Sequence, residues 1–132
     1  MKKAIKLIVM LLFAVAMATM SSCSKENSYQ RKIVGKWVVV NDVIHWNNVP
    51  GEPTTETGPN IGLIWEFRTN GKMIVGGREL PYTIDGDSLF YRGALSTVDW
   101  KIVELTNSTM ELERTSREYG GRKWQSLELE KR

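Results

Sequence analysis

Residues 33–46, Ile-Val-Gly-Lys-Trp-Val-Val-Val-Asn-Asp-Val-Ile-His-Trp, are the stretch that decides the fold. Half of these residues are valine or isoleucine. Their branched Cβ atoms lose rotamer freedom in a helix and pack well on the pleated surface of a sheet. The stretch therefore predicts a long β-strand that opens the folded part of the chain.

Seven later segments continue the pattern, because apolar and polar residues alternate along each of them with a period of two. The alternation slips at Ile102-Val103, where a β-bulge would restore the register. A helical period of 3.6 residues is not sustained anywhere, and a single helical turn fits only at 29–34 or 115–119. The sequence predicts an all-β domain of eight strands, whose later members are 61–68, 72–76, 79–84, 88–92, 97–105, 108–114 and 123–131.

The connections between these strands differ in kind. The second, fourth and sixth are tight turns, and Asn-Gly and Asp-Gly pairs accept the positive φ angles that such turns need. The other four are longer or rich in glycine. Because odd and even loops of an up-and-down meander lie at opposite ends, we expect a closed antiparallel barrel with one sealed end and one open end. The tight turns are Thr69–Gly71, Ile84–Asp87 and Thr106-Asn107, and the other connections are 47–60, 76–78, 93–96 and 115–122.

Closure of the barrel requires the first and last strands to pair. The last strand reads Leu127-Glu128-Leu129-Glu130, and an unpaired edge of this kind invites aggregation. We therefore expect it to pair with the first strand near Val38–Val40.

The N-terminus has the layout of a secretory signal. Lys2, Lys3 and Lys6 precede an apolar run over 7–19, which is shorter than the ~20 residues of a membrane-spanning helix. Small residues then lead to Cys23, the only cysteine. The segment resembles a bacterial lipoprotein signal, in which this cysteine becomes the lipidated first residue. That resemblance implies a signal peptide over 1–22, a lipidated Cys23 with a polar tether over 23–32, and a folded domain over 33–132. The alternative is an ordinary secretory signal with an incidental cysteine.

The charge balance excludes nucleic-acid binding as the expected function. The chain has 18 basic and 15 acidic residues, and three of the lysines lie in the leader. The remainder thus carries equal numbers of each, without the basic field that phosphate binding needs.

A resemblance to the lipocalin, or calycin-type, barrels rests on Gly35-Lys36-Trp37 and on the long first loop 47–60. Lipocalins begin their first strand with Gly-x-Trp near the closed end, and their first loop crosses the open end. Residues 31–132 are most similar to lipocalin-like domains of envelope lipoproteins from Bacteroidetes-type bacteria. The resemblance implies that Trp37 plugs the sealed end under a late basic side chain, Lys131 or Arg132. It also implies a small hydrophobic ligand at the open end.

The residues that could carry catalysis or bind metal each have a simpler explanation. His45 is the only histidine, which rules out a histidine-rich metal site. Asp85 and Asp87 lie in a tight turn and lack the calcium-loop pattern. The glutamates near the C-terminus alternate with apolar residues, as on the outer face of a strand. We expect no enzyme activity, catalytic residue, metal or cofactor.

The aromatic residues are the remaining candidates for a binding site, and the alternative is that they only fill the barrel. Two functions stay open: binding of a small hydrophobic ligand, or an interaction role in which the open-end loops contact a protein or glycan. A hydrolase is a third class, which no catalytic constellation of residues supports. In either case we expect a monomer that a lipid holds in the bacterial cell envelope, at the outer membrane. The candidate ligand-binding residues are Trp46, Trp65, Tyr82, Tyr91, Trp100 and Tyr119.

Overall fold

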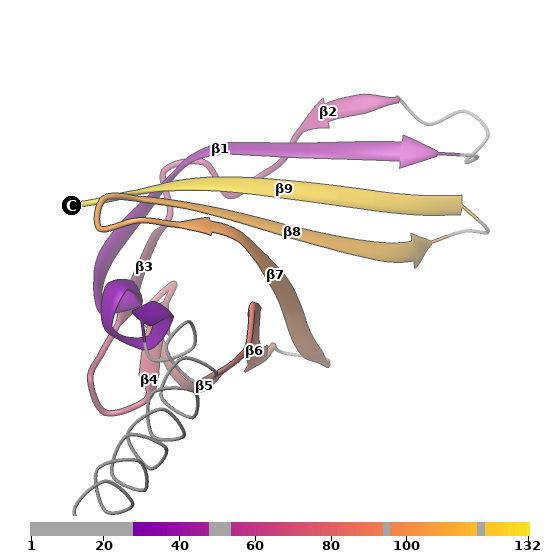
Figure 1. Cartoon of the computed structure of the whole chain (residues 1–132). Coiled ribbons are helices and arrows are strands. Elements are labelled where there is room, and N and C mark those ends of the chain that lie inside the picture. Colours follow the sequence, from indigo (N-terminus) through magenta and orange to yellow (C-terminus); the bar gives the residue numbers. More distant parts are fainter. Residues whose placement is uncertain (1–27, 48–53, 94–95, 119–120) are drawn as a thin grey trace, which may run out of the picture.

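The computed structural model of the chain describes residues 28–47, 54–93, 96–118 and 121–132. They form a short helix over 28–33 and one antiparallel sheet of nine strands (Figure 1). None of the described helices is long and apolar enough to cross a membrane. The strands are β1 (Gly35–Asn47), β2 (Thr55–Thr57), β3 (Ile64–Phe67), β4 (Lys72–Val75), β5 (Arg78–Asp85), β6 (Ser88–Arg92), β7 (Thr97–Leu105), β8 (Thr109–Glu118) and β9 (Gly121–Lys131).

Eight of these strands close into a barrel, because β1 pairs with β3 on one edge and with β9 on the other. Val38 lies opposite Glu130 and Val39 opposite Leu129, so the predicted pairing of the first and last strands is confirmed. β2 is the ninth strand, and it lies beside residues 43–45 of β1. It falls within the predicted loop 47–60, where its exposed Thr-Glu-Thr sequence offers no apolar alternation to reveal a strand.

The barrel has one tall wall and one low wall. β1, β8 and β9 have 13, 10 and 11 residues, whereas β3, β4 and β6 have 4, 4 and 5. Figure 1 shows the three long strands running side by side past the shorter ones toward the open end. The inner face of the tall wall is therefore only partly opposed by other strands near that end.

Two of the four connections expected to be longer or rich in glycine are tight. Val75 pairs with Arg78, so Gly76 and Gly77 form a two-residue turn with φ of 57° and 77°. Glu118 pairs with Gly121, so β8 and β9 continue as a hairpin into the segment 115–122 that was predicted to be a loop. The alternative prediction, a helical turn at 115–119, is also wrong, because β8 extends to Glu118. The polar residues Thr115–Glu118 looked like a loop, yet backbone pairing between β8 and β9 holds them in the sheet.

Trp37 seals one end of the barrel, as its position predicts. Its side chain is 0% exposed, and its Nε1 donates a hydrogen bond of 2.7 Å to the Ile33 carbonyl in the helix. Lys131 Nζ lies 5.2 Å from the centre of the ring and donates to the Lys32 carbonyl. A Cβ on Gly35 would come within 2.8 Å of the Lys131 side chain. The glycine of Gly-x-Trp is needed here for its φ of 132°, which strains any residue with a Cβ, whereas the lysine side chain could shift.

The core fills the sealed half of the barrel with apolar side chains. Residues opposite one another in adjacent strands share a face, so each inward position fixes the next around the ring. The short helix contributes Ile33, the residue directly after the predicted tether over 23–32. The buried set in this half comprises Ile33, Trp37, Val39, Phe67, Met73, Ile84, Leu89, Ile102, Leu105, Met110, Leu112, Leu127 and Leu129.

Two β-bulges shift which residues face the interior. The predicted bulge is present between Ile102 and Glu104, and it leaves Val103 42% exposed on the outer face. A second, unpredicted bulge lies between Val39 and Asn41, and Val40 is 40% exposed there. Because of the second bulge, Asp42 lies opposite the inward Leu127. A polar residue thereby enters the barrel.

Candidate ligand-binding site

The open half of the barrel holds a cluster of aromatic side chains, Trp65, Tyr91 and Trp100. We call it the aromatic cluster. The ring centre of Trp65 lies 6.0 Å from that of Tyr91 and 6.3 Å from that of Trp100, both in tilted or edge-on arrangements that aromatic pairs favour. Trp100 Nε1 donates a hydrogen bond of 2.8 Å to the Tyr91 hydroxyl. Three strands, β3, β6 and β7, thus bring together three of the candidate residues.

A chain of polar side chains crosses the tall wall beside the aromatic cluster. Arg114 Nε donates to Gln125 Oε1 at 3.0 Å, and Gln125 Nε2 donates to Asp42 Oδ1 at 2.9 Å. We call these three residues the polar chain. Asp42 and Gln125 are buried, whereas Arg114 is half-buried. The guanidinium carbon of Arg114 also lies 4.7 Å from the centre of the Trp100 ring, which joins the polar chain to the aromatic cluster.

The carboxylate of Asp42 is held by the segment between β2 and β3. Asn60 donates to Oδ2 from its backbone nitrogen at 3.0 Å and from Nδ2 at 2.8 Å. The Gly58 nitrogen donates to the backbone carbonyl of Asp42 at 2.8 Å. A Cβ at Gly58 would overlap the Asp42 carboxylate. Position 58 therefore has to be glycine for the buried charge to keep these partners.

We expect Gly58→Ala to destabilise the domain by at least ~2 kcal/mol, because it displaces a buried carboxylate from its hydrogen-bond donors. Chemical denaturation would measure this loss. Thr57→Ala, an exposed change next to it in the chain, is the control and should alter the free energy of unfolding by less than about 0.5 kcal/mol. Equal effects from the two variants would show that Asp42 does not depend on the space at Gly58.

The Tyr91 hydroxyl stays protonated in this setting. Burial raises its pKa above the ordinary value of 10.0, while the hydrogen bond from Trp100 and the charge of Arg114 partly oppose that rise. Since the oxygen already accepts from Trp100, its own hydrogen remains available for donation. Tyr91 can therefore act as a donor to a bound molecule at any neutral pH.

Some inward side chains near the open end are less buried than those of the sealed half. Val75, Tyr91, Val98 and Arg114 face inward by register but are only half-buried, unlike the inward residues of the sealed half. Depressions of about 620 and 290 Å³ also occur, but they lie beside the short helix at the sealed end and involve Gln30, Val34 and Thr69. They are outside the aromatic cluster.

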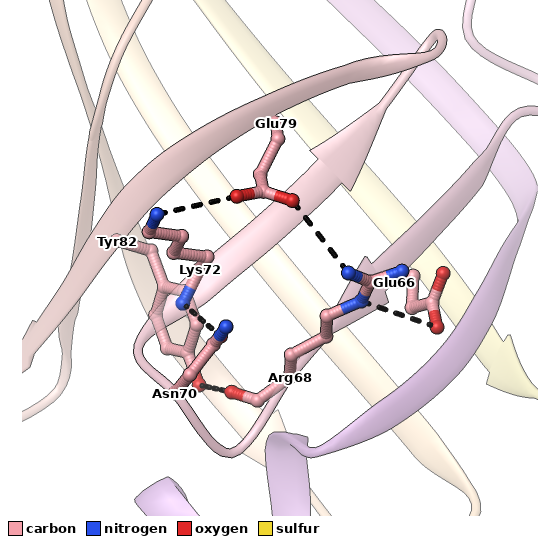
Figure 2. Close-up of polar contacts among 6 residues, drawn as sticks. All are labelled: Glu66, Arg68, Asn70, Lys72, Glu79 and Tyr82. Carbon is pink, nitrogen blue, oxygen red and sulfur yellow. Dashed lines mark hydrogen bonds and ion pairs between the residues drawn. The ribbon is translucent and has the colours of Figure 1, made fainter.

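Tyr82 is not part of the aromatic cluster. Its ring packs edge-on against Phe67, with 5.0 Å between the ring centres. Its hydroxyl donates a hydrogen bond of 3.1 Å to the Arg68 carbonyl at the sealed end. Figure 2 shows this bond beneath a set of exposed charges in which Arg68 and Lys72 both pair with Glu79. Exposed pairs of this kind contribute little to stability. The structure thus gives Tyr82 a role in holding the turn after β3.

The other predicted aromatic residues lie at the mouth or outside the described part of the chain. Trp46 Nε1 donates a hydrogen bond of 3.0 Å to Glu56 Oε1, and Lys123 Nζ lies 5.0 Å from the centre of the Trp46 ring. Trp124 lies outside the barrel, with its ring centre 4.8 Å from that of His45, on the opposite face of β9 from the inward Gln125. Tyr119 and Cys23 fall outside the described residues.

Sequence reasoning missed the polar chain altogether. Asp42 was hidden by the bulge at Val40, because simple alternation from Val39 places residue 41 inside. Arg114 and Gln125 lie beyond the apolar part of their strands. Arg114 is the last residue of the strand predicted over 108–114. The signal that could have found them is their alternation in register with Met110-Leu112 and Leu127-Leu129.

No family model and no curated protein matches this chain. The fold is an eight-stranded antiparallel barrel with one additional strand, and it is compatible with a lipocalin-like protein.

Proposed function

We propose that the protein is a lipid-anchored, lipocalin-like binding protein of the bacterial cell envelope, monomeric and without enzyme activity, that holds a small apolar or ring-bearing molecule in the open half of its barrel. The observation that carries this proposal is the aromatic cluster, in which Tyr91 is half-buried beside the buried rings of Trp65 and Trp100. Sites for small molecules are concave and mostly apolar, with a few convergent polar groups. The barrel supplies both kinds of group.

The proposed anchor gives the barrel an orientation. The described part of the short helix, residues 28–33, contacts the sealed end through Ile33 and Trp37. Five Cα-to-Cα steps separate Cys23 from residue 28, and a fully extended chain of that length spans at most about 18 Å. A lipid on Cys23 would keep the sealed end near the membrane. The mouth would then face away from it, open to ligands or partners.

We expect Cys23→Ser to move the protein from the membrane fraction to the soluble fraction or to leave it unprocessed. One acyl chain anchors only marginally, so the mature form should carry more than one. Metabolic labelling with a fatty-acid analogue, followed by fractionation, measures both effects. Ser22→Ala, which keeps a small residue before the cysteine, is the control. A protein that takes up no label would contradict the anchor.

Native mass spectrometry of the protein purified from its own host tests the ligand. We expect a small-molecule mass that stays with the folded chain and is lost on denaturation, in addition to the lipid on Cys23. The outcome against the proposal is a protein that carries only that lipid and releases no further molecule. Trp65→Ala should lower the ligand-bound fraction, because it removes a central ring of the aromatic cluster.

An interaction role remains the second candidate, and an exposed apolar surface favours it. Ile61, Leu63 and Ile64 are 38–48% exposed on the segment that leads into β3, next to Val40 at the bulge. Contiguous apolar surface of this kind often marks contact with another protein. It lies beside β1 and β3, away from the open-end turns that the sequence suggested for such a partner.

A further inference from the structure

We propose that the sealed end of the barrel is a membrane-contact surface that binds the anionic headgroups of phospholipids. The inference concerns the outside of the barrel, not its interior. It rests on the anchor in the proposed function, because a lipid on Cys23 would bring this end to the bilayer.

Five basic residues gather at the sealed end, where the short helix, the start of β1 and the end of β9 meet. Lys131 Nζ donates a hydrogen bond of 3.0 Å to the Lys32 carbonyl, and the Arg132 backbone nitrogen donates one of 2.9 Å to the Lys36 carbonyl. These two bonds bring cations from opposite ends of the domain sequence side by side. We call the set the basic surface, and it consists of Arg31, Lys32, Lys36, Lys131 and Arg132.

The charge of the basic surface is not neutralised by acidic side chains of the domain. Among the residues that the structure describes, no carboxylate forms an ion pair with any of its five members. Glu66 lies opposite Lys36 in the sheet, but its ion pair is with Arg68. Arg31, Lys36 and Arg132 are also exposed. Such a cluster creates a positive potential that attracts an anionic partner.

The remaining acidic residues of the sealed end lie across the barrel from the basic surface. Asp85 and Asp87 flank the turn between β5 and β6. In the sheet order, β3 and β4 separate β1 from β5, and β7 and β8 separate β9 from β6, so this turn is opposite the β1–β9 pair. The two carboxylates would be repelled by an anionic bilayer. The side formed by the helix, β1 and β9 therefore faces the membrane.

A depression beside the basic surface has room for a headgroup. Its volume is about 620 Å³, and Gln30, Arg31, Val34 and Thr69 border it. The side chains of Gln30, Arg31 and Thr69 are exposed and carry N–H or O–H donors, which suit the acceptor oxygens of a phosphate. Arginine in particular binds phosphate through two parallel hydrogen bonds. A phospholipid phosphate next to Arg31 thus meets several donors at once.

The proposed anchor favours contact at this end over the open end. The tether from Cys23 to residue 28 spans at most about 18 Å, which gives the basic surface a high effective concentration at the bilayer. β1 has 13 residues and, at ~3.3 Å per residue, places the open end roughly 40 Å farther away. That distance is several Debye lengths at physiological salt. Contact at the sealed end would also hold the mouth away from the membrane.

The test measures binding of the mature chain, residues 23–132 with Cys23→Ser, to lipid vesicles by co-sedimentation. This chain lacks the leader and the lipid, and it keeps the described helix and all nine strands. We expect it to bind vesicles of equimolar phosphatidylcholine and phosphatidylglycerol, and not vesicles of phosphatidylcholine alone. Salt at about 1 M, where the Debye length is about 3 Å, should abolish the binding.

A triple variant removes the exposed part of the basic surface. Each Lys or Arg near an anionic membrane contributes about fivefold to binding, so the loss of three should weaken binding to the mixed vesicles roughly 100-fold. The substitutions are Arg31→Gln, Lys36→Gln and Arg132→Gln, all at exposed positions.

A charge-matched control removes three exposed cations from the open end, through Arg78→Gln, Arg92→Gln and Arg122→Gln. It should weaken binding by less than about threefold, because salt screens charges held that far from the bilayer. Equal losses from the two triple variants would overturn the assignment. Equal binding of the parent chain to both kinds of vesicle would also overturn it.

Hydrogen exchange of the parent chain gives a second reading if the sealed-end variant fails to fold. On the mixed vesicles, the amides of 29–36 should exchange more slowly, while those of 76–78 and 92–93 keep their rates. Slower exchange at 76–78 and 92–93 alone would contradict the proposal. Neither measurement needs a lipid on Cys23, so their failure leaves the anchor intact, and fatty-acid labelling tests the anchor separately.

Discussion

Trp37→Ala is expected to lower the free energy of unfolding by about 3–5 kcal/mol, the range for truncating a large buried aromatic side chain. The indole is fully buried, donates to Ile33 and lies beneath Lys131. Its removal leaves a cavity at the point where the helix, β1 and β9 meet. A domain with ~5–15 kcal/mol of total stability would lose a large share of it. Urea denaturation followed by circular dichroism measures the change.

Trp124→Ala is the matched control, because it removes the same side chain from the outer face of β9. Trp124 is half-buried, and His45 is the one aromatic ring that it contacts among the described residues, so its loss should cost far less than that of Trp37. If the two variants unfold at the same denaturant concentration, Trp37 does not seal the barrel.

Truncation after Gln125 should prevent the domain from folding. The lost segment carries Leu127 and Leu129, both buried in the core, and six of the ten residue pairs between β9 and β1. Without it the barrel has two free edges and an open core, which favours aggregation. Size-exclusion chromatography and the dispersion of amide NMR signals would report the loss. Removal of Arg132 alone, an exposed terminal residue, should leave a folded monomer. A truncated chain that stays monomeric and melts cooperatively would contradict barrel closure.

The sequence predicted those parts of the fold that depend on apolar alternation. The eight strands, the closure between β1 and β9 and the bulge after Ile102 follow from where large apolar side chains recur, while the burial of Trp37 was implied by the resemblance to lipocalins. A one-residue slip would turn such a strand inside out, so its register is strongly specified. These features could therefore be read without any knowledge of tertiary contacts.

The features that were missed depend on backbone pairing or on partners distant in sequence. β2 and the outer parts of β8 and β9 are polar, and their strands exist because a neighbouring strand offers hydrogen bonds. Alternation from Val39 predicts that Asp42 faces outward, but the bulge at Val40 turns it into the barrel. Gln125 meets Asp42 across 83 residues of sequence, a contact that local patterns do not encode. The candidate site was accordingly predicted in its aromatic part and not in its polar part.

The indole N–H signals of the five tryptophans offer the most direct test of binding inside the open half. In nitrogen-15 NMR each indole reports on its own location: Trp37 at the sealed end, Trp65 and Trp100 in the aromatic cluster, Trp46 at the mouth and Trp124 on the outer face. On titration with 1-dodecanol, the account predicts saturable shifts of Trp65 and Trp100 while Trp37 and Trp124 stay in place. Saturable shifts at Trp124 with Trp65 and Trp100 unmoved would contradict it.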